Sequence, residues 1–354
     1  MGDRGNDSSA EAQASSQAPC NDKLPKELVD AMQALFGKHP GFRTTHAKGL
    51  LVEGTFTPSA EAKTLSIAPH FCNPSTPVIA RFSVGGGFPV IRDTDNQATP
   101  KGLVIRFQIS EDIHTDLVAH TFDGFATRNG EDFLTFLRLL GAVGKADAAL
   151  KKAKEENKDT TEEQAALDQA RKSFGAFLET HPPAKAFFTS VKPNPHDYGT
   201  IVYYQPNTHI LTNAEGKETN VRYRLIPQDG VHLYDSSVID RIAESYLEID
   251  LLQRFPIRPI VFTIKAHIAD PEDVLDDATV PYKSTTFVDV GRLEINKVSD
   301  DNDNKQQQIA FSPTPEKGGV QGIRASNDPL IQTRRGVYGI SAGQRRNEER
   351  EVQE

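Results

Sequence analysis

The sequence predicts an α+β domain built around an antiparallel sheet or a closed barrel. Short runs rich in β-branched and aromatic residues occupy 49–57, 76–84 and 101–109, and their composition is typical of strands. A helical segment follows over 130–190, and strand-like runs return from Tyr198. Strands and helices do not alternate regularly along the chain, so a parallel βα sheet is not indicated.

The first element is an amphipathic helix over residues 24–38. Leu28, Met32 and Leu35 recur at helical spacing, and Gly37 ends the pattern. Residues 49–110 then change to the period of strands, with Gly, Pro and Asp at the boundaries.

The helical segment divides into two parts. An apolar stretch comes first, and a stretch rich in Ala, Glu and Lys follows it, with a break near Asp159–Thr161. This composition predicts a solvated helical hairpin, to which we assign no chemistry.

Strands return with the run 198–227, in which Asn213–Gly216 is a plausible hairpin turn. Residues 237–254 have a helical pattern, and further strands are predicted over 257–268 and 285–298. No internal repeat or linker interrupts the order, which predicts one domain.

Composition excludes several classes of protein. The 354 residues carry a net charge of -9 without a dense basic run, so nucleic-acid binding is not expected. No apolar run approaches the roughly 20 residues of a membrane span. Cys20 and Cys72 are too few for a disulfide framework. We therefore expect a soluble cytoplasmic protein.

Both ends of the chain are polar. Residues 1–22 lack the apolar core of a secretory signal and are predicted to be a disordered tail. The folded domain is predicted over 23–346, and residues 347–354 are predicted to be a frayed C-terminal tail.

Two stretches carry candidate chemistry. The first is FRTTHAKG, residues 42–49, in which His46 is a base, a metal ligand or a surface residue at the start of a strand. The second is ASNDPLIQTRRGVYGISAGQRR, residues 325–346. Asp328 followed by Pro329 is a good start for a helix, with a side-chain acceptor at the N-cap and proline at the first position.

The predicted C-terminal helix places Leu330, Arg334, Tyr338 and Arg345 on one face. A guanidinium beside a phenol favours the phenolate, and a phenolate can bind ferric haem. An ordinary Arg–Tyr packing pair is the alternative. Three glycines in the same helix cost roughly 1 kcal/mol each, which suggests that something flat or bulky approaches its backbone; these are Gly336, Gly339 and Gly343.

Several stretches together resemble haem catalases. FRTTHAKG is similar to their distal signature, and ARFSV (80–84) to the Arg-Phe-Ser strand that follows it. DPLIQTRRGVYGISAGQR resembles their proximal helix, and the segments 203–227 and 307–313 are also similar, in the same order. The chain is short for a catalase, so it resembles most the minimal catalase-related peroxidases. The resemblance implies a closed antiparallel β-barrel with a helical insertion, a C-terminal helix and a buried haem.

The resemblance also implies a role for each residue of the proximal helix. Tyr338 is the axial tyrosinate ligand of a ferric haem b, Arg334 keeps it deprotonated, and Asp328 fixes the arginine. The haem propionates need cationic partners, and arginine suits a carboxylate because its planar fork binds bidentately. The arginines that match are Arg43, Arg81 and Arg345.

On the distal side, His46 is the implied acid–base group. Ser83 lies two residues after Arg81, so both side chains point to the same side of a strand. Ser83 then forms a hydrogen bond with the far nitrogen of His46 and fixes its tautomer. Neutral imidazole is both donor and acceptor, so His46 can move a proton between the two oxygens of a peroxide.

The sequence departs from catalases at two positions. Their distal asparagine follows an Asp-Leu-Val run, which here reads DLVAHTFDG (116–124), and we place Thr121 at that position. Thr45 precedes His46 where an aliphatic residue is usual. Both departures favour a peroxidase that reduces hydrogen peroxide or organic hydroperoxides with a small organic electron donor, in peroxide detoxification.

Three other functions stay open at this point. The first is a true catalase, in which another group replaces the asparagine. The second is a fatty-acid hydroperoxide isomerase of the allene oxide synthase type, and the third is a haem-binding or sensor protein without enzymatic activity. A homo-oligomer is possible by resemblance, and the sequence does not indicate whether NADPH binds.

Overall fold

The computed structural model describes residues 23–350 except 191 and 256. Within them, ten antiparallel strands form one sheet in the order β10-β6-β7-β5-β4-β3-β2-β1-β9-β8. The strands are β1 Gly49–Pro58, β2 Thr76–Ser83, β3 Gly102–Gln108, β4 His114–His120, β5 Tyr203–Tyr204, β6 His209–Thr212, β7 Glu218–Pro227, β8 Ile260–Ile268, β9 Phe287–Val298 and β10 Ile323–Ala325.

The sheet closes on itself because β7 pairs with β8 as well as with β5. The closed barrel has eight strands, and β6 and then β10 extend the sheet outward from β7. Large apolar side chains fill the barrel, among them Phe56, Phe82, Tyr203 and Phe262, which are fully buried. The predicted closed antiparallel barrel is confirmed.

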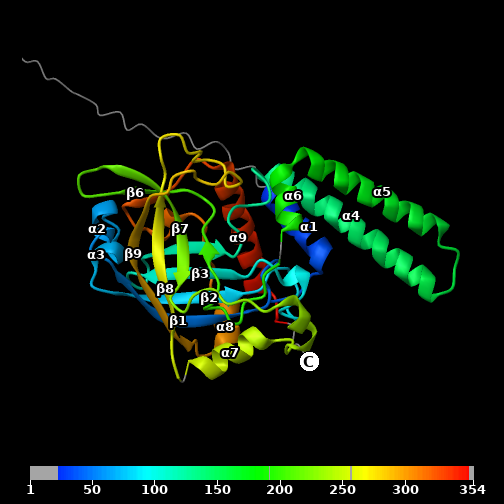
Figure 1. Ribbon diagram of the computed structural model, residues 1–354, viewed down its shortest axis with the longest axis horizontal. Helices are drawn as coiled ribbons and strands as arrows, with labels where there is room; N and C mark the ends of the chain where they lie inside the picture. The colour runs from blue at the N-terminus through cyan, green and yellow to red at the C-terminus, as the bar shows by residue number, and fades with distance from the viewer. Residues whose placement is uncertain (1–22, 191, 256, 351–354) are drawn as a thin grey trace, which may run out of the picture.

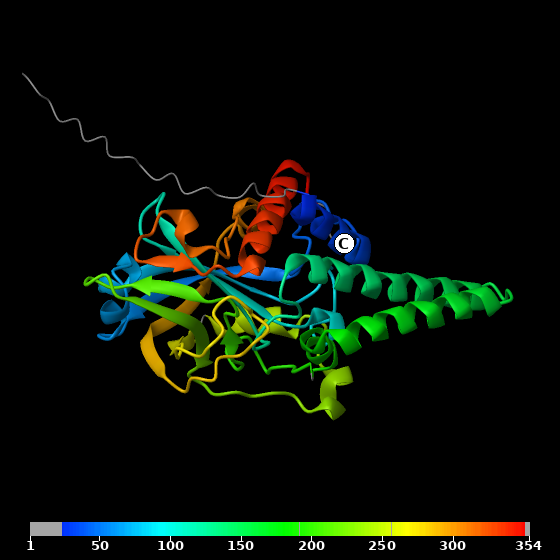
Figure 2. The ribbon, with the colours of Figure 1, turned by 90° about the horizontal axis from the view of Figure 1, so that it is seen from above.

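Helices α1, α4, α5 and α6 lie on one side of the barrel, and the hairpin of α4 and α5 projects away from it (Figures 1 and 2). A second apolar core joins α1, α4, α5 and α6, and α9 packs against α1 and α4. The helices are α1 Lys23–Phe36, α2 Ala62–Leu65, α3 Pro69–Cys72, α4 Gly130–Glu155, α5 Thr161–Thr180, α6 Pro182–Thr189, α7 Tyr246–Arg254, α8 Asn302–Gln308 and α9 Pro329–Asn347. Single 3-10 turns cover Asn96–Ala98, Ser236–Arg241 and Pro315–Gly318.

The local signals in the sequence mark these elements well. Helix α1 ends at Phe36, and Gly37 follows with a left-handed φ of +87°. The predicted hairpin turn joins β6 to β7, and its Asn213 side chain accepts hydrogen bonds from two backbone N–H groups. The prediction of one helix over 237–254 is wrong in part, because residues 242–245 separate the 3-10 turn from α7.

The structure describes the two predicted tails to different extents. Residues 1–22, with Cys20, lie outside the described residues. At the other end, Glu348 pairs with Lys38 at 2.8 Å, and the guanidinium of Arg350 lies 4.6 Å from the ring centroid of Phe42. These contacts tie the chain to the domain as far as residue 350, and the fraying predicted for 347–354 stays a prediction.

Cys72 is exposed and forms no disulfide with any described residue. In the part of the chain that the structure describes, no helix has the length and apolar character needed to cross a bilayer.

The barrel interior holds buried histidines. Their protonation on unfolding lowers the stability of the protein at acid pH, and this effect can be measured. Burial lowers the pKa of His70 to about 3, and its Nδ1 has no partner among the described residues. An unfolded chain binds a proton at this imidazole below about pH 6.5, so the free energy of unfolding falls as the pH drops from there toward 3.

His70→Phe is expected to reduce this loss of stability. Between pH 7 and pH 4.5 the variant should lose about 2–3 kcal/mol less unfolding free energy than the wild type. Urea unfolding at both pH values measures the difference, and any change in packing cancels because it contributes at both. An identical pH dependence in the two proteins contradicts the prediction.

Candidate active site

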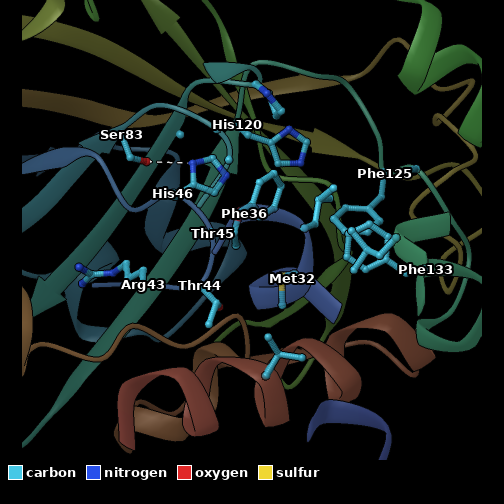
Figure 3. Close-up of a pocket in the computed structure, with 18 of the residues that line it drawn as sticks. Met32, Phe36, Arg43, Thr44, Thr45, His46, Ser83, His120, Phe125 and Phe133 are labelled. Atoms are coloured by element: carbon cyan, nitrogen blue, oxygen red, sulfur yellow. Dashed lines mark hydrogen bonds between the residues drawn. The ribbon is translucent and has the colours of Figure 1, made fainter. Parts of the chain in front are cut away.

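A cavity of about 850 Å³ lies between the barrel wall and the helices. Its lining side chains are mostly apolar and come from α1, α4, α9 and the strands β2, β3 and β4. Every residue predicted for the site lines it except Asp328 and Thr121. Figure 3 shows the histidines on the barrel side and helix α9 across the cavity from them. Sequence segments nearly 300 residues apart, around His46 and Tyr338, thus meet at one place.

Helix α9 presents Arg334 and Tyr338 to the cavity. The Asp328 side chain caps the helix by accepting a hydrogen bond from the Leu330 N–H at 2.9 Å. One turn separates the arginine from the tyrosine, and an Arg334 N–H donates to the Tyr338 hydroxyl at 3.5 Å.

Asp328 supports Arg334 indirectly, through a residue that the sequence did not indicate. Arg334 donates to the side-chain oxygen of Asn207, and the Asn207 amide donates to Asp328 at 2.8 Å. Burial raises the pKa of Asp328. Asp328 therefore reaches Arg334 through Asn207, in a chain of three side chains.

The three glycines of α9 differ in what a side chain at each position would contact. A Cβ on Gly336 would lie 2.6 Å from Pro25 of α1, so this glycine permits close packing of two helices. A Cβ on Gly339 or Gly343 would meet no protein atom within 4 Å. The expectation that something flat or bulky approaches the helix backbone is thus met at Gly336, where the bulky neighbour is helix α1, and no described protein atom meets it at Gly339 or Gly343.

Three arginines gather at one end of the cavity. Burial and then the charges of Arg81 and Arg345 hold the pKa of Arg43 well below its usual value. Burial also lowers the pKa of Arg81 to about 9 and that of Arg345 to about 10. Among the described residues, none of the three pairs with a carboxylate. Buried cations without counter-charges are costly, so this cluster is suited to an anionic ligand.

The three arginines differ in how many of their N–H groups donate to protein acceptors and how many remain available to a ligand. Arg345 donates to the carbonyls of Gln307, Ile309 and Ser341. Within residues 23–350, apart from 191 and 256, Arg43 makes a single hydrogen bond, to the Ile309 carbonyl at 3.2 Å. Arg43 therefore retains most of its five donors.

Arg81 has a positioning role that the sequence did not predict. It donates to the backbone carbonyls of His46 and Ala47 at 2.9 and 3.0 Å, and to the side chain of Gln306 at 2.7 Å. His46 has a φ of +54°, a left-handed conformation that is unfavourable for a residue other than glycine. The guanidinium thus holds the backbone that presents the histidine.

The His46 ring lies beside Ser83, and Nδ1 is 3.1 Å from the serine Oγ (Figure 3). This contact leaves Nε2 as the ring atom that can act on a ligand. Burial, followed by the charge of Arg81, lowers the pKa of His46 to about 4. The imidazole is therefore neutral at physiological pH and able to accept a proton.

Gly102 makes room for this ring. It pairs with Ser83 on β2 and with His120 on β4, so the three residues form one rung across the sheet. A Cβ on Gly102 would lie 2.6 Å from Ser83 Oγ and 3.0 Å from His46 Nδ1. Because Gly102 has no side chain, the His46 ring can occupy the space beside its Cα.

Gly102→Ala is expected to displace His46 from Ser83. Both contacts are shorter than van der Waals distance, and Arg81 restrains the histidine backbone, so the ring must rotate away. We expect the rate of reaction with hydrogen peroxide to fall about 10²-fold, as a small misplacement of a catalytic group does. Stopped-flow absorption measures the rate. Gly144→Ala, at a lining position where a Cβ meets no atom within 4 Å, is the control. Equal rates in the two variants would contradict the role of Gly102.

The two predicted threonines have different positions. Thr45 lines the cavity. Thr121 does not, because its hydroxyl accepts a hydrogen bond from the Lys101 N–H at 3.1 Å. The cavity residue at this point of the chain is the preceding His120, which is buried. Alternation along the strand explains the correction, since adjacent residues point to opposite faces.

Aromatic rings form the wall beside Arg334. Its guanidinium lies 5.6 Å from the ring centroid of Phe125 and 5.9 Å from that of Tyr338. Phe125 also packs against Phe133 at 5.3 Å between centroids. These phenylalanines and Asn207 had no recognisable signal in the sequence, because their role depends on the fold alone.

Comparison with known proteins gives one consistent result. The chain is 28% identical over 325 residues to the "Catalase-related peroxidase" of Synechococcus elongatus, covering 91% of this chain and 88% of that protein. It is 27% identical over 332 residues to the protein of the same name from Mycolicibacterium paratuberculosis, covering 93% and 97%. Catalase-1 of Arabidopsis thaliana is 28% identical, and the match spans 86% of this chain but 59% of that protein.

Solved structures agree on the fold. A fungal catalase superposes with a TM-score of 0.68 at 19% identity, over 87% of this chain and 59% of that one. Catalase A from Saccharomyces cerevisiae gives a TM-score of 0.65 over 87% and 62%. The sequence model of the family described as "Catalase" matches residues 25–349. This chain belongs to the catalase family.

Proposed function

We propose that the protein is a haem peroxidase that reduces hydrogen peroxide or organic hydroperoxides with electrons from a small organic donor. The observation that carries the proposal is the pairing of two groups across one cavity. Tyr338 with Arg334 stands on the helix side, and His46 with Ser83 stands on the barrel side. Two relatives that match most of their own length are named catalase-related peroxidases.

The residues present fit a haem b. Catalase family membership implies a haem cofactor, and the cluster of Arg43, Arg81 and Arg345 has the charge that two propionates require. Tyr338 would hold the iron, because a phenolate binds ferric haem iron and the adjacent Arg334 favours that form. When bound, the haem supplies a ferric iron that binds peroxide and stores oxidising equivalents.

The chain itself moves the proton. His46 Nε2 accepts a proton from one peroxide oxygen and returns it to the other, which leaves as water or an alcohol. Ser83 holds the ring at Nδ1, and Arg81 holds the backbone behind it. Each turnover consumes one hydroperoxide, two electrons from the donor and two protons, and yields water and, from an organic hydroperoxide, the alcohol.

The cavity lining supports the choice of a peroxidase that accepts organic substrates. Apolar side chains from α1 and α4 continue the cavity beyond the histidines, among them Met32, Phe36, Leu137 and Leu140. Such a lining accommodates an apolar substituent on the peroxide. A cytoplasmic location and a homo-oligomer stay predictions from the sequence.

Stopped-flow spectroscopy of the purified holoprotein tests the proposal. Mixing with hydrogen peroxide or cumene hydroperoxide should give a long-lived oxidised spectrum that a phenolic donor returns to the ferric state. Rapid oxygen evolution without any donor would instead indicate a true catalase. Consumption of a lipid hydroperoxide without either donor or oxygen would indicate an isomerase.

A further inference from the structure

A second, much smaller cavity lies inside the barrel, apart from the cavity around His46. Its volume is about 10 Å³, and none of the described residues that line it also lines the larger cavity. Apolar side chains from β1, β3, β4 and β8 enclose it, among them Phe56, Phe107, Leu117 and Ile264. These side chains belong to the apolar core of the barrel, so the small cavity lies within that core.

Three residues that line this cavity each carry a buried polar atom without a hydrogen-bond partner among the residues that the structure describes. The atoms are His70 Nδ1, His209 Nδ1 and the Tyr223 hydroxyl oxygen. The three residues are only 2–3% exposed, so bulk solvent does not satisfy them. Unpaired polar atoms in an apolar core are costly, and buried polar groups of native proteins nearly always have a partner. Three such atoms around one cavity therefore point to a polar ligand.

The ligand must both donate and accept hydrogen bonds. Burial lowers the pKa of His209 to about 3, although a hydrogen bond to the Pro313 carbonyl opposes the shift. The neutral ring uses its N–H on that carbonyl, so Nδ1 is an acceptor, whereas the Tyr223 hydroxyl is also a donor. The His209 and Tyr223 rings are neighbours, with 5.9 Å between their centroids, but their polar atoms form no direct hydrogen bond. Burial also lowers the pKa of His70 to about 3, so both imidazoles are uncharged.

The size of the cavity limits the ligand to one small molecule. A volume of about 10 Å³ matches a single water-sized probe, and a buried water typically makes about three hydrogen bonds to groups that lack other partners. A metal ion does not fit, because the described residues include no group of three or more His, Cys, Asp or Glu side chains that could hold one.

We propose that this cavity is the binding site of one structural water molecule. The water accepts a hydrogen bond from the Tyr223 hydroxyl, donates one to His209 Nδ1 and forms a third with His70 Nδ1. Because water is both donor and acceptor, it matches either tautomer of His70. His209 belongs to β6, Tyr223 to β7 and His70 to α3, so the water joins three elements through the apolar core.

A high-resolution crystal structure of the wild-type holoprotein tests the site directly. The expected result is a peak of electron density within hydrogen-bonding distance, about 2.7–3.2 Å, of all three polar atoms. A cavity without this peak, or a peak whose anomalous signal identifies an ion, overturns the proposal. This result does not depend on whether the protein is a peroxidase.

Tyr223→Phe tests the same site in solution, because phenylalanine removes only the hydroxyl. If that hydroxyl is bonded to a buried water, its removal should raise the equilibrium constant of unfolding about fivefold. An unpaired hydroxyl would give the opposite result, since its removal relieves a desolvation cost. Urea unfolding of the variant and the wild type measures the change.

Tyr203→Phe is the matched reference for this measurement. Its hydroxyl is also buried in the barrel, and it donates to the Tyr198 carbonyl at 3.1 Å. This substitution should raise the unfolding constant by a factor similar to that of Tyr223→Phe. A Tyr223→Phe protein with an unfolding constant at or below the wild-type value, while Tyr203→Phe shows the increase, would contradict the water site.

Discussion

Tyr338→Phe is expected to remove both the ferric tyrosinate absorption spectrum and the peroxide reaction of the protein. Phenylalanine keeps the ring that packs beside Arg334, at 5.9 Å from its guanidinium, and removes only the oxygen. Loss of groups that merely support a metal ligand typically costs 10- to 100-fold, so loss of the ligand itself should cost about 10²-fold or more. Haem content, the Soret band and the rate of reaction with hydrogen peroxide are the measurements.

The control is a tyrosine that does not line the cavity. Tyr234 packs on His196, with 4.3 Å between ring centroids, and does not line the cavity. Tyr234→Phe should therefore leave haem content, spectrum and rate unchanged. A Tyr338→Phe protein that retains the wild-type spectrum would show that another residue holds the iron.

The fold could be predicted because each element carries its own signal. The period of β1, β2 and β3 and the cap of α9 are local patterns. The strands and the helix start that they predicted are present in the structure. Closure of the barrel is different, because it depends on β7 pairing with β8 across many residues. Nothing in either segment alone records its partner, so closure came from the resemblance.

The site residues divide in the same way, into those that a local pattern marks and those that only the fold brings together. Arg334 and Tyr338 were found together because helical spacing puts them on one face. Asn207 was missed because it reaches Arg334 from a distant segment. The choice of Thr121 over His120 failed by one residue, and a shift of one in a strand exchanges the two faces. The position of a residue relative to a sequence motif is uncertain by about one residue, whereas its pairing with Gly102 in the sheet fixes which face it occupies.

His46→Gln is expected to leave the haem spectrum in place and to slow the reaction with hydrogen peroxide about 10²- to 10⁴-fold, the usual contribution of a general acid–base group. Glutamine retains a hydrogen-bonding side chain of similar reach but cannot take up a proton near neutral pH. Ser83→Ala should have a smaller effect, since Ser83 only orients the ring through Nδ1. Single-turnover stopped-flow measurements separate this step from reduction by the donor. Equal rates in His46→Gln and Ser83→Ala would contradict the assignment of His46 as the base.

The pH dependence of the rate of reaction with hydrogen peroxide is a second test of His46 as the base. A base must be neutral to act, and burial together with Arg81 lowers the pKa of His46 to about 4. The rate should therefore stay nearly constant from pH 7 to about pH 5 and fall as the imidazole protonates near pH 4. An ordinary histidine would begin to lose activity near pH 6.5. Arg81→Gln removes the second cause of the lowered pKa, so it should move the fall in rate to higher pH. A profile that does not move would mean that burial alone sets the acid limit and that Arg81 acts only on the backbone of His46.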